Sequence, residues 1–265
     1  MKNIAMVTLA RSGSSYFTRS VQKNFNFLKG TAEIFHPNKG FKDIMNNIYE
    51  HNNLSVSEKL QAEIDRVKFC STYEEKPELI LKLLSDIAIE SDFYGVFFKI
   101  MEGHLYNQCR DLERIYDLGN TNFFFLTRSV ADSIISLLKA REKNIWENND
   151  TTNMKIHVNP DEFLDIFQRD SKWLNKSYEF LSTKTEIRKI KYEEIFNELN
   201  KPNETICKFI NKYVGDDLHI EEYNHMDKQD RNEGWEHKVK NSDEVKKVIL
   251  NNGIPEHYSN LIDNN

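Results

Sequence analysis

Hydroxyl and guanidinium side chains gather in a short segment near the amino terminus, directly after an apolar run. The residues concerned are Arg11, Ser12, Gly13, Ser14, Ser15 and Tyr16, and a helical pattern follows them. A turn between a strand and a helix points backbone N–H groups outward, and the helix N-terminus adds positive partial charge. We therefore expect this segment to bind a phosphate group, the alternative being an ordinary turn and helix cap.

The same segment also indicates which class of nucleotide could bind. It lacks the Gly-Lys-Ser/Thr ending of a nucleoside triphosphatase P-loop, whose lysine and hydroxyl hold the phosphates and Mg²⁺. The run Phe123 to Thr127 is followed by Arg128 and not by a carboxylate that would hold the metal. A P-loop-type nucleotide or nucleoside kinase is thus disfavoured but stays as an alternative, and so does a non-catalytic nucleotide-binding protein of the same fold.

A second group of polar residues follows a later apolar run. Arg128 leaves this run, and Ser136 lies eight residues further on, inside an apolar helical pattern. A guanidinium and a hydroxyl suit a phosphate group as donors. The alternative is that Arg128 pairs with Asp132 at a helix start and that Ser136 only packs.

The elements that must position these groups follow from apolar periodicity. Four short apolar runs predict buried strands at Ile4 to Leu9, Tyr94 to Ile100, Asn122 to Thr127 and Ile187 to Tyr192. Amphipathic helical patterns separate them, so we expect a three-layer α/β/α sandwich with a central, mainly parallel sheet of the P-loop-NTPase-like kind. We predict one domain over 1–265. In such folds the ligand lies beyond the carboxyl ends of the strands.

The composition limits the class of partner. The 265 residues include 36 basic and 42 acidic ones, a net charge of -6, so no general positive field would hold nucleic acid. The first apolar run is too short for a signal peptide, and no run approaches the length of a membrane span. Three cysteines without CxxC spacing favour a reducing cytoplasm. We expect a cytoplasmic protein without membrane insertion, and the composition does not define an oligomeric state.

The order of these segments resembles sulfotransferases that use 3′-phosphoadenylyl sulfate (PAPS), and the bacterial and carbohydrate-type branch in particular. Residues 10 to 15 are similar to the family's 5′-phosphosulfate loop, although the cytosolic small-molecule branch typically has Lys where Arg11 stands. The pattern of Arg128 and Ser136 resembles the family's 3′-phosphate site. Residues 95 to 101 and 187 to 195 also match in order, the latter resembling the family's "RYEDL" segment.

The resemblance implies a cofactor, a product and a set of catalytic residues. The cofactor is PAPS, the product is adenosine 3′,5′-bisphosphate, and the acceptor carries a hydroxyl group: a carbohydrate, a lipid or a small alcohol. Glu33 is the first choice of general base, because Gly30 to Asn38 resembles the family's "GEIF-NP" segment. His36, three residues on, and His104, after the second strand, are the other two choices.

Three lysine and glutamine residues complete the expected site. Lys99 would touch the sulfonate, the alternative being a surface ion pair. Lys228 and Gln229 lie in a stretch loosely similar to the cofactor-closing segment of the bacterial branch, where a solvated loop is the alternative. The eight histidines show no HExxH spacing and the cysteines no paired spacing, so we predict no required metal.

Overall fold

A parallel four-stranded sheet forms the centre of the molecule. The computed structural model describes residues 2–36, 41–52, 61, 77–144, 151, 153–196, 201–215 and 234–263. The strands are β1 (Asn3–Thr8), β2 (Phe97–Ile100), β3 (Thr121–Thr127) and β4 (Arg188–Lys191), in the order β2-β1-β3-β4. Every neighbouring pair is parallel. All four predicted strands are confirmed.

Apolar side chains project from both faces of the sheet, as the nearly continuous apolar runs predict. Within β1, Ala5 and Val7 belong to one buried cluster, and Ile4 and Met6 belong to the other. The strands alternate in this way because successive side chains point to opposite faces. Both faces therefore need a covering layer of helices.

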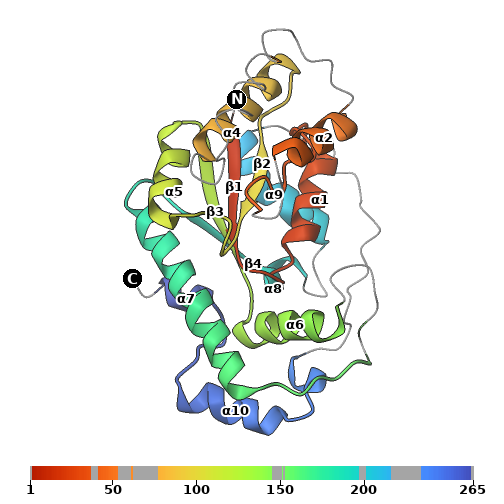
Figure 1. Cartoon of the computed structure of the whole chain (residues 1–265), viewed down its shortest axis with the longest axis vertical. Coiled ribbons are helices and arrows are strands. Elements are labelled where there is room, and N and C mark those ends of the chain that lie inside the picture. The colour runs from red at the N-terminus through yellow and green to blue at the C-terminus, as the bar shows by residue number, and fades with distance from the viewer. Residues whose placement is uncertain are drawn as a thin grey trace.

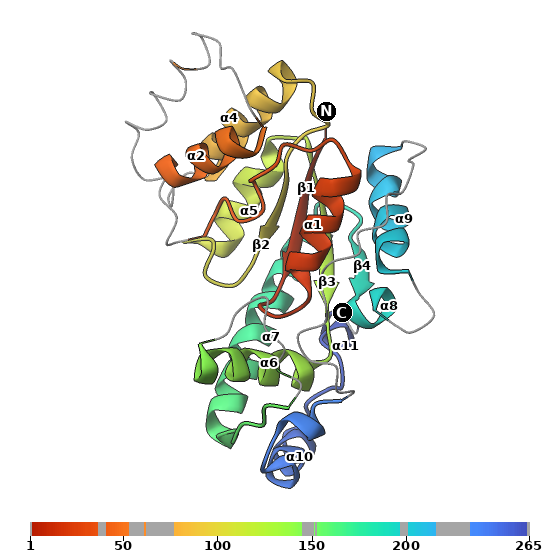
Figure 2. The ribbon, with the colours of Figure 1, turned by 90° about the vertical axis from the view of Figure 1, so that its right-hand side faces the viewer.

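The chain folds helices over both faces. The helices are α1 (Ser14–Asn24), α2 (Phe41–Asn52), α4 (Pro77–Glu90), α5 (Gln108–Asp117), α6 (Val130–Lys143), α7 (Pro160–Ser182), α8 (Tyr192–Ile195), α9 (Pro202–Val214), α10 (Ser242–Asn251) and α11 (Ser259–Asp263), with a short 3-10 turn η1 (Glu236–Lys238). Helices α1 and α9 cover one face, and α4, α5 and α7 cover the other (Figure 1, Figure 2). The predicted three-layer α/β/α sandwich is confirmed.

Packed aromatic rings fill the layer beneath α1 and α9. The ring of Phe17 in α1 lies 5.3 Å from that of Phe124 in β3, and Phe124 lies 5.0 Å from Phe209 in α9. Aromatic pairs at such separations add stability beyond their buried area. This packing fixes α1 against the sheet, and with it the turn that leads from β1 into α1.

The order of the strands changes direction between β1 and β3. The connection after β1 leads to β2 on one side, whereas β3 lies on the other side of β1. The segments that leave β1 and β3 therefore diverge, which is the arrangement that opens a crevice in doubly wound folds. Helices α6 and α10 and the first half of α7 lie beyond this carboxyl edge (Figure 1, Figure 2).

None of the described helices combines the length and the apolar character that crossing a bilayer requires. The longest, α7, alternates a buried face with charged residues.

Candidate functional site at the carboxyl edge of the sheet

The turn between β1 and α1 has the predicted geometry. Arg11 and Gly13 both adopt positive φ, at 63° and 84°, and Gly13 is the residue that caps the start of α1. The N–H groups of the first turn of any α-helix have no carbonyl partner four residues earlier. Those of Ser14, Ser15 and Tyr16 therefore lie at the amino end of α1 as donors for an anion.

The hydroxyl groups of this turn have structural partners. Ser12 is 1% exposed, and its Oγ lies 2.5 Å from the Oγ1 of Thr8. Thr8 in turn donates to the carbonyl of Leu126 in β3 at 2.9 Å. Ser14 is also buried. The Tyr16 hydroxyl donates to Asn203 in α9 at 3.1 Å, so this side chain is directed toward α9.

Arg11, Arg128 and Ser136 come together at the carboxyl ends of β1 and β3. The Nε of Arg11 donates to the Oγ of Ser136 at 3.2 Å, and an Nη of Arg128 donates to the Arg11 carbonyl at 2.8 Å. Ser133 in α6 donates to the Ala10 carbonyl at 3.1 Å. The amino-terminal turn is thus joined directly to the first turns of α6. The two groups of residues that the sequence predicts to bind phosphate form one cluster.

Tyr192 lies between this cluster and the glycine of the turn. The guanidinium carbon of Arg128 is 4.3 Å from the centre of the Tyr192 ring. A Cβ atom at Gly13 would lie 2.5 Å from a ring carbon of Tyr192, closer than a side chain tolerates. Two features therefore require glycine at this position: the positive φ and the close approach of the Tyr192 ring.

One nitrogen of Arg128 has no partner among the described residues. Its Nε–H is buried and donates a hydrogen bond to none of them. A buried N–H group without an acceptor costs about 1–3 kcal/mol. A ligand oxygen at this position would remove that cost, so the geometry of Arg128 suits an anion.

A second group of predicted residues lies between the 31–36 segment and the end of β2. Glu33 and Lys99 form an ion pair with an Oε1 to Nζ distance of 2.6 Å, and the Lys99 side chain is almost fully buried. The ring centres of His36 and His104 lie 5.6 Å apart. The backbone N–H of Lys99 donates to the Ala32 carbonyl at 2.9 Å, which holds the two segments together. Lys99 is thus not in a surface ion pair.

Burial controls the protonation of His104. The pKa of His104 is lowered to about 4 by loss of solvation, and the nearby His36 lowers it further. Glu33 acts in the opposite direction. At neutral pH the His104 ring is therefore uncharged, and its Nδ1 atom is buried without a partner among the described residues.

Three residues of the site carried no predicted role. Tyr192 lies in the segment of residues 187 to 195, whose sequence suggested a family match but not the contact with Gly13. Asp132 is bound by the buried Lys238 at 2.9 Å, although Arg128 was the partner weighed for it from the sequence. No local pattern around Lys238 indicates this pairing.

Lys228 and Gln229 lie outside the described residues.

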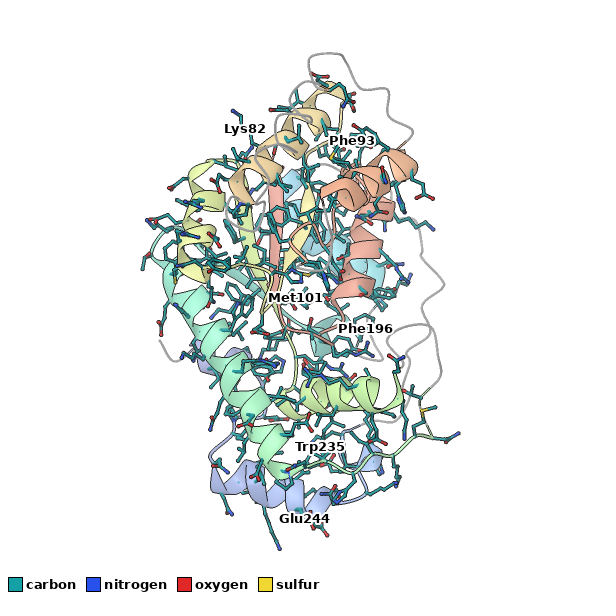
Figure 3. All side chains as sticks on the ribbon, in the orientation of Figure 1. Lys82, Phe93, Met101, Phe196, Trp235 and Glu244 are labelled. Atoms are coloured by element: carbon teal, nitrogen blue, oxygen red, sulfur yellow. The ribbon has the colours of Figure 1, made fainter. Side chains whose placement is uncertain are left out.

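Metal-ligating side chains do not cluster in the part of the chain that the structure describes, where no group of three or more His, Cys, Asp or Glu side chains could hold an ion. Figure 3 shows Met101, just past β2, and Phe196, just past α8, near the centre of the molecule, with Trp235 closer to α10. Phe196 packs on Tyr192 with ring centres 4.5 Å apart. Helix α8 and the residue after it therefore contribute two aromatic rings that pack together at the site.

Comparison with known proteins gives one structural neighbour to report. No protein-family model matches the chain, and no curated protein matches its sequence. Among solved structures, the sulfotransferase domain from the curacin biosynthetic pathway is similar, with a TM-score of 0.46 and 17% sequence identity. The match covers 80% of this chain and 74% of that domain.

Proposed function

We propose that the protein is a sulfotransferase that binds PAPS and transfers its sulfuryl group to a hydroxyl-bearing acceptor. The observation that carries the proposal is the convergence of Arg11, Arg128 and Ser136 at the carboxyl ends of two neighbouring parallel strands. Two guanidinium groups and a hydroxyl match a ligand with more than one phosphate group. The sequence resemblance to PAPS-dependent enzymes points to the same residues.

The residues present fit such a nucleotide. The buried Nε–H of Arg128 lacks an acceptor among the described residues, and an oxygen of a 3′-phosphate would be that acceptor. The first N–H groups of α1 would donate to the 5′-phosphate. Arg11 starts in the turn proposed for the 5′-phosphate, and its side chain reaches Ser136, which is proposed for the 3′-phosphate.

In this proposal PAPS, when bound, supplies the sulfuryl group, and adenosine 3′,5′-bisphosphate leaves with the negative charge on its 5′-phosphate. The N–H groups at the start of α1 stabilise the charge that develops on that phosphate, and donors held in place by the fold need no reorganisation. Glu33 takes the proton of the acceptor hydroxyl, with His36 and His104 as the other candidates. General-base catalysis of this kind is worth about 10²–10⁴-fold in rate.

Lys99 has two consequences for this chemistry. Its ammonium group lies 2.6 Å from the Glu33 carboxylate and therefore fixes the position of that carboxylate. Lys99 is also a buried cation, and in this proposal its charge would act on an oxygen of the sulfonate. Positioning and charge stabilisation are the main contributions expected from a protein in such in-line transfers.

Calorimetry with adenosine 3′,5′-bisphosphate, and separately with ATP and Mg²⁺, tests the nucleotide site. We expect the bisphosphate to bind in preference to ATP, and Arg128→Ala to weaken its binding by about 1.5–3 kcal/mol, the range for a charge-assisted hydrogen bond. Arg188→Ala is the matched control, because Arg188 also stacks on a tyrosine, Tyr213, with 4.7 Å from its guanidinium carbon to the ring centre. It should leave the affinity unchanged.

Transfer of radiolabelled sulfur from PAPS to a panel of hydroxyl acceptors then tests turnover. Preference for ATP and Mg²⁺ in the calorimetry would favour the kinase alternative. Tight bisphosphate binding without any transfer would favour a non-catalytic nucleotide-binding protein. Absence of binding to either nucleotide would overturn the site assignment as a whole.

A further inference from the structure

The carboxyl-terminal segment is built into the frame of the candidate nucleotide site. Its residue Glu256 accepts from the N–H of Val130 at 3.0 Å, and the N–H of Tyr258 donates to the carbonyl of Arg128 at 3.3 Å. Ser129 and His257 form an antiparallel bridge between these two contacts. The backbone on both sides of the Arg128 peptide is therefore held by a segment more than a hundred residues away in the chain.

One carboxylate joins three parts of this frame. Glu193, in α8, accepts from the backbone N–H of Ser129 through Oε1 at 2.9 Å. Through Oε2 it lies 2.8 Å from the Nε2 of His257. The residue before Glu193 is Tyr192, whose ring packs on the Arg128 guanidinium. Glu193 thus connects α8, the start of α6 and the carboxyl-terminal segment around a single arginine.

The hydrogen bonds define which nitrogen of His257 carries the proton. The backbone N–H of Ser259 donates to the Nδ1 of His257 at 3.0 Å, so Nδ1 is an acceptor. In a neutral ring the proton is then on Nε2, which donates to Glu193. His257 therefore caps the start of α11 with one nitrogen and binds Glu193 with the other.

The same contacts exclude a hydrolytic role for this group. Ser259, His257 and Glu193 stand in the order of a nucleophile, a base and an acid. Ser259 is only 1% exposed, and the ring nitrogen beside it already accepts the serine's own backbone N–H. A nucleophile needs access to a substrate and a base with an available lone pair. The group is structural with respect to that chemistry.

We propose that Glu193 and His257 are positioning residues that set Arg128 and the first turn of α6 for the nucleotide. The proposal rests on the proposed function, because Arg128 is its nucleotide-binding residue. Glu193 fixes the N–H of the residue directly after Arg128, and His257 fixes Glu193. A guanidinium that must meet a phosphate within hydrogen-bond distance loses affinity when its backbone is free to shift.

Two substitutions of His257 separate this role from a general effect on stability. His257→Gln retains a donor at the place of Nε2 and loses the acceptor for Ser259. His257→Asn retains an acceptor at the place of Nδ1 and loses the donor to Glu193. His257→Gln thus loses the contacts of Nδ1 with the N–H and the Oγ of Ser259, and His257→Asn loses the contact of Nε2 with Glu193, so each variant is a control for the other. Thermal unfolding, measured in parallel, identifies any variant that has lost its fold.

The affinity for adenosine 3′,5′-bisphosphate is the deciding measurement. We expect His257→Asn, which removes the hydrogen bond to Glu193, to weaken binding by about five- to tenfold, and His257→Gln, which keeps it, to weaken binding by about twofold or less. Glu193→Ala removes the contacts with both Ser129 and His257, so its loss of affinity should be at least as large as that of His257→Asn. Equal affinities of the Asn variant and the wild type, or equal losses in the Asn and Gln variants, would overturn the positioning role and leave the nucleotide site standing. A wild-type protein that does not bind the bisphosphate would overturn the proposed function itself.

Discussion

The Nε of Arg11 donates to the Oγ of Ser136 at 3.2 Å, although 125 positions separate the two residues in the chain. Arg11 follows β1 and Ser136 lies in α6, which follows β3, and β1 and β3 are neighbours in the sheet. The contact therefore joins the segment that leaves β1 to the segment that leaves β3, between which the strand order changes direction.

Ser136→Ala removes the hydroxyl that Arg11 contacts. We expect it to weaken the binding of adenosine 3′,5′-bisphosphate by about 0.5–1.5 kcal/mol, the usual net value of a hydrogen bond, and calorimetry measures this directly. The matched control is Ser182→Ala, because Ser182 is exposed at the end of α7 and its hydroxyl bonds only the Glu179 carbonyl at 3.0 Å. If both variants bind alike, Ser136 has no part in the site.

Gly13→Ala tests the approach of Tyr192 to the amino-terminal turn. The added Cβ meets a positive φ of 84° and a ring carbon at 2.5 Å. We expect a loss of unfolding free energy of about 2–4 kcal/mol, combining the backbone cost with that of overpacking. Gly119→Ala is the control, since its φ is 72° and nothing lies within 4 Å of a Cβ there. It should cost about 1 kcal/mol in the same denaturant titration.

If Gly13→Ala lowered the unfolding free energy by no more than Gly119→Ala does, the close packing of Tyr192 on Gly13 would be contradicted. The double variant Gly13→Ala with Tyr192→Leu adds a second criterion. Removal of the aromatic ring makes room for the Cβ, so the two losses should be less than additive.

Lys238→Met tests the buried ion pair with Asp132. The Lys238 side chain is 5% exposed and that of Asp132 20%, and their charged atoms lie 2.9 Å apart. Burial works to raise the pKa of Asp132, but Lys238 and then Arg128 outweigh it, so that pKa lies below its usual value. Removal of one partner of a buried pair costs about 3–5 kcal/mol, and we expect the loss of unfolding free energy to approach that range.

The control for this pair is an exposed one. Lys208 and Glu204 lie 2.6 Å apart, yet their side chains are 70% and 38% exposed. Lys208→Met should therefore change the unfolding free energy by less than about 1 kcal/mol. Comparable losses at the two lysines would show that burial does not govern the Asp132 pair.

His104 should make the protein less stable as the pH falls. Its pKa is lowered from 6.5 to about 4, chiefly by burial, so between these pH values the unfolded chain binds a proton that the folded chain does not. Stability then decreases as the pH is lowered through this window, with a slope of at most about 1.4 kcal/mol per pH unit for one proton. Unfolding titrations of the wild type and His104→Gln between pH 7 and pH 4 measure the difference. Identical slopes would mean that His104 titrates normally.

The general base is assigned by rates and affinities together. We expect Glu33→Gln to lower the rate of sulfuryl transfer by about 10²–10⁴-fold and to leave bisphosphate affinity within about twofold, because a base acts on the acceptor and not on the nucleotide. His36→Gln and His104→Gln are the comparisons. Should one of these lower the rate more than the Glu33 variant does, that histidine takes the role of base.

The sequence by itself determined the strands, the main helices and the turn after β1. Apolar runs of strand length and apolar residues at helical spacing record which faces are buried, and this is local information. Gly13 and the serines around it likewise mark a turn into a helix wherever they occur. The positions of Arg128 and Ser136 at the carboxyl edge followed from the strand pattern, because that edge is where parallel strands deliver their following residues.

Only the tertiary structure decided which of these side chains meet. Arg11 bonds Ser136, Tyr192 packs on Gly13 and Arg128, Lys238 pairs with Asp132, and Glu193 binds His257. Each pair joins segments that are distant in the chain, and no local periodicity specifies a partner across such a distance. Burial, which made His104 neutral and the Lys238 pair strong, is likewise a property of the assembled layers, because only a folded core removes water from a charged group.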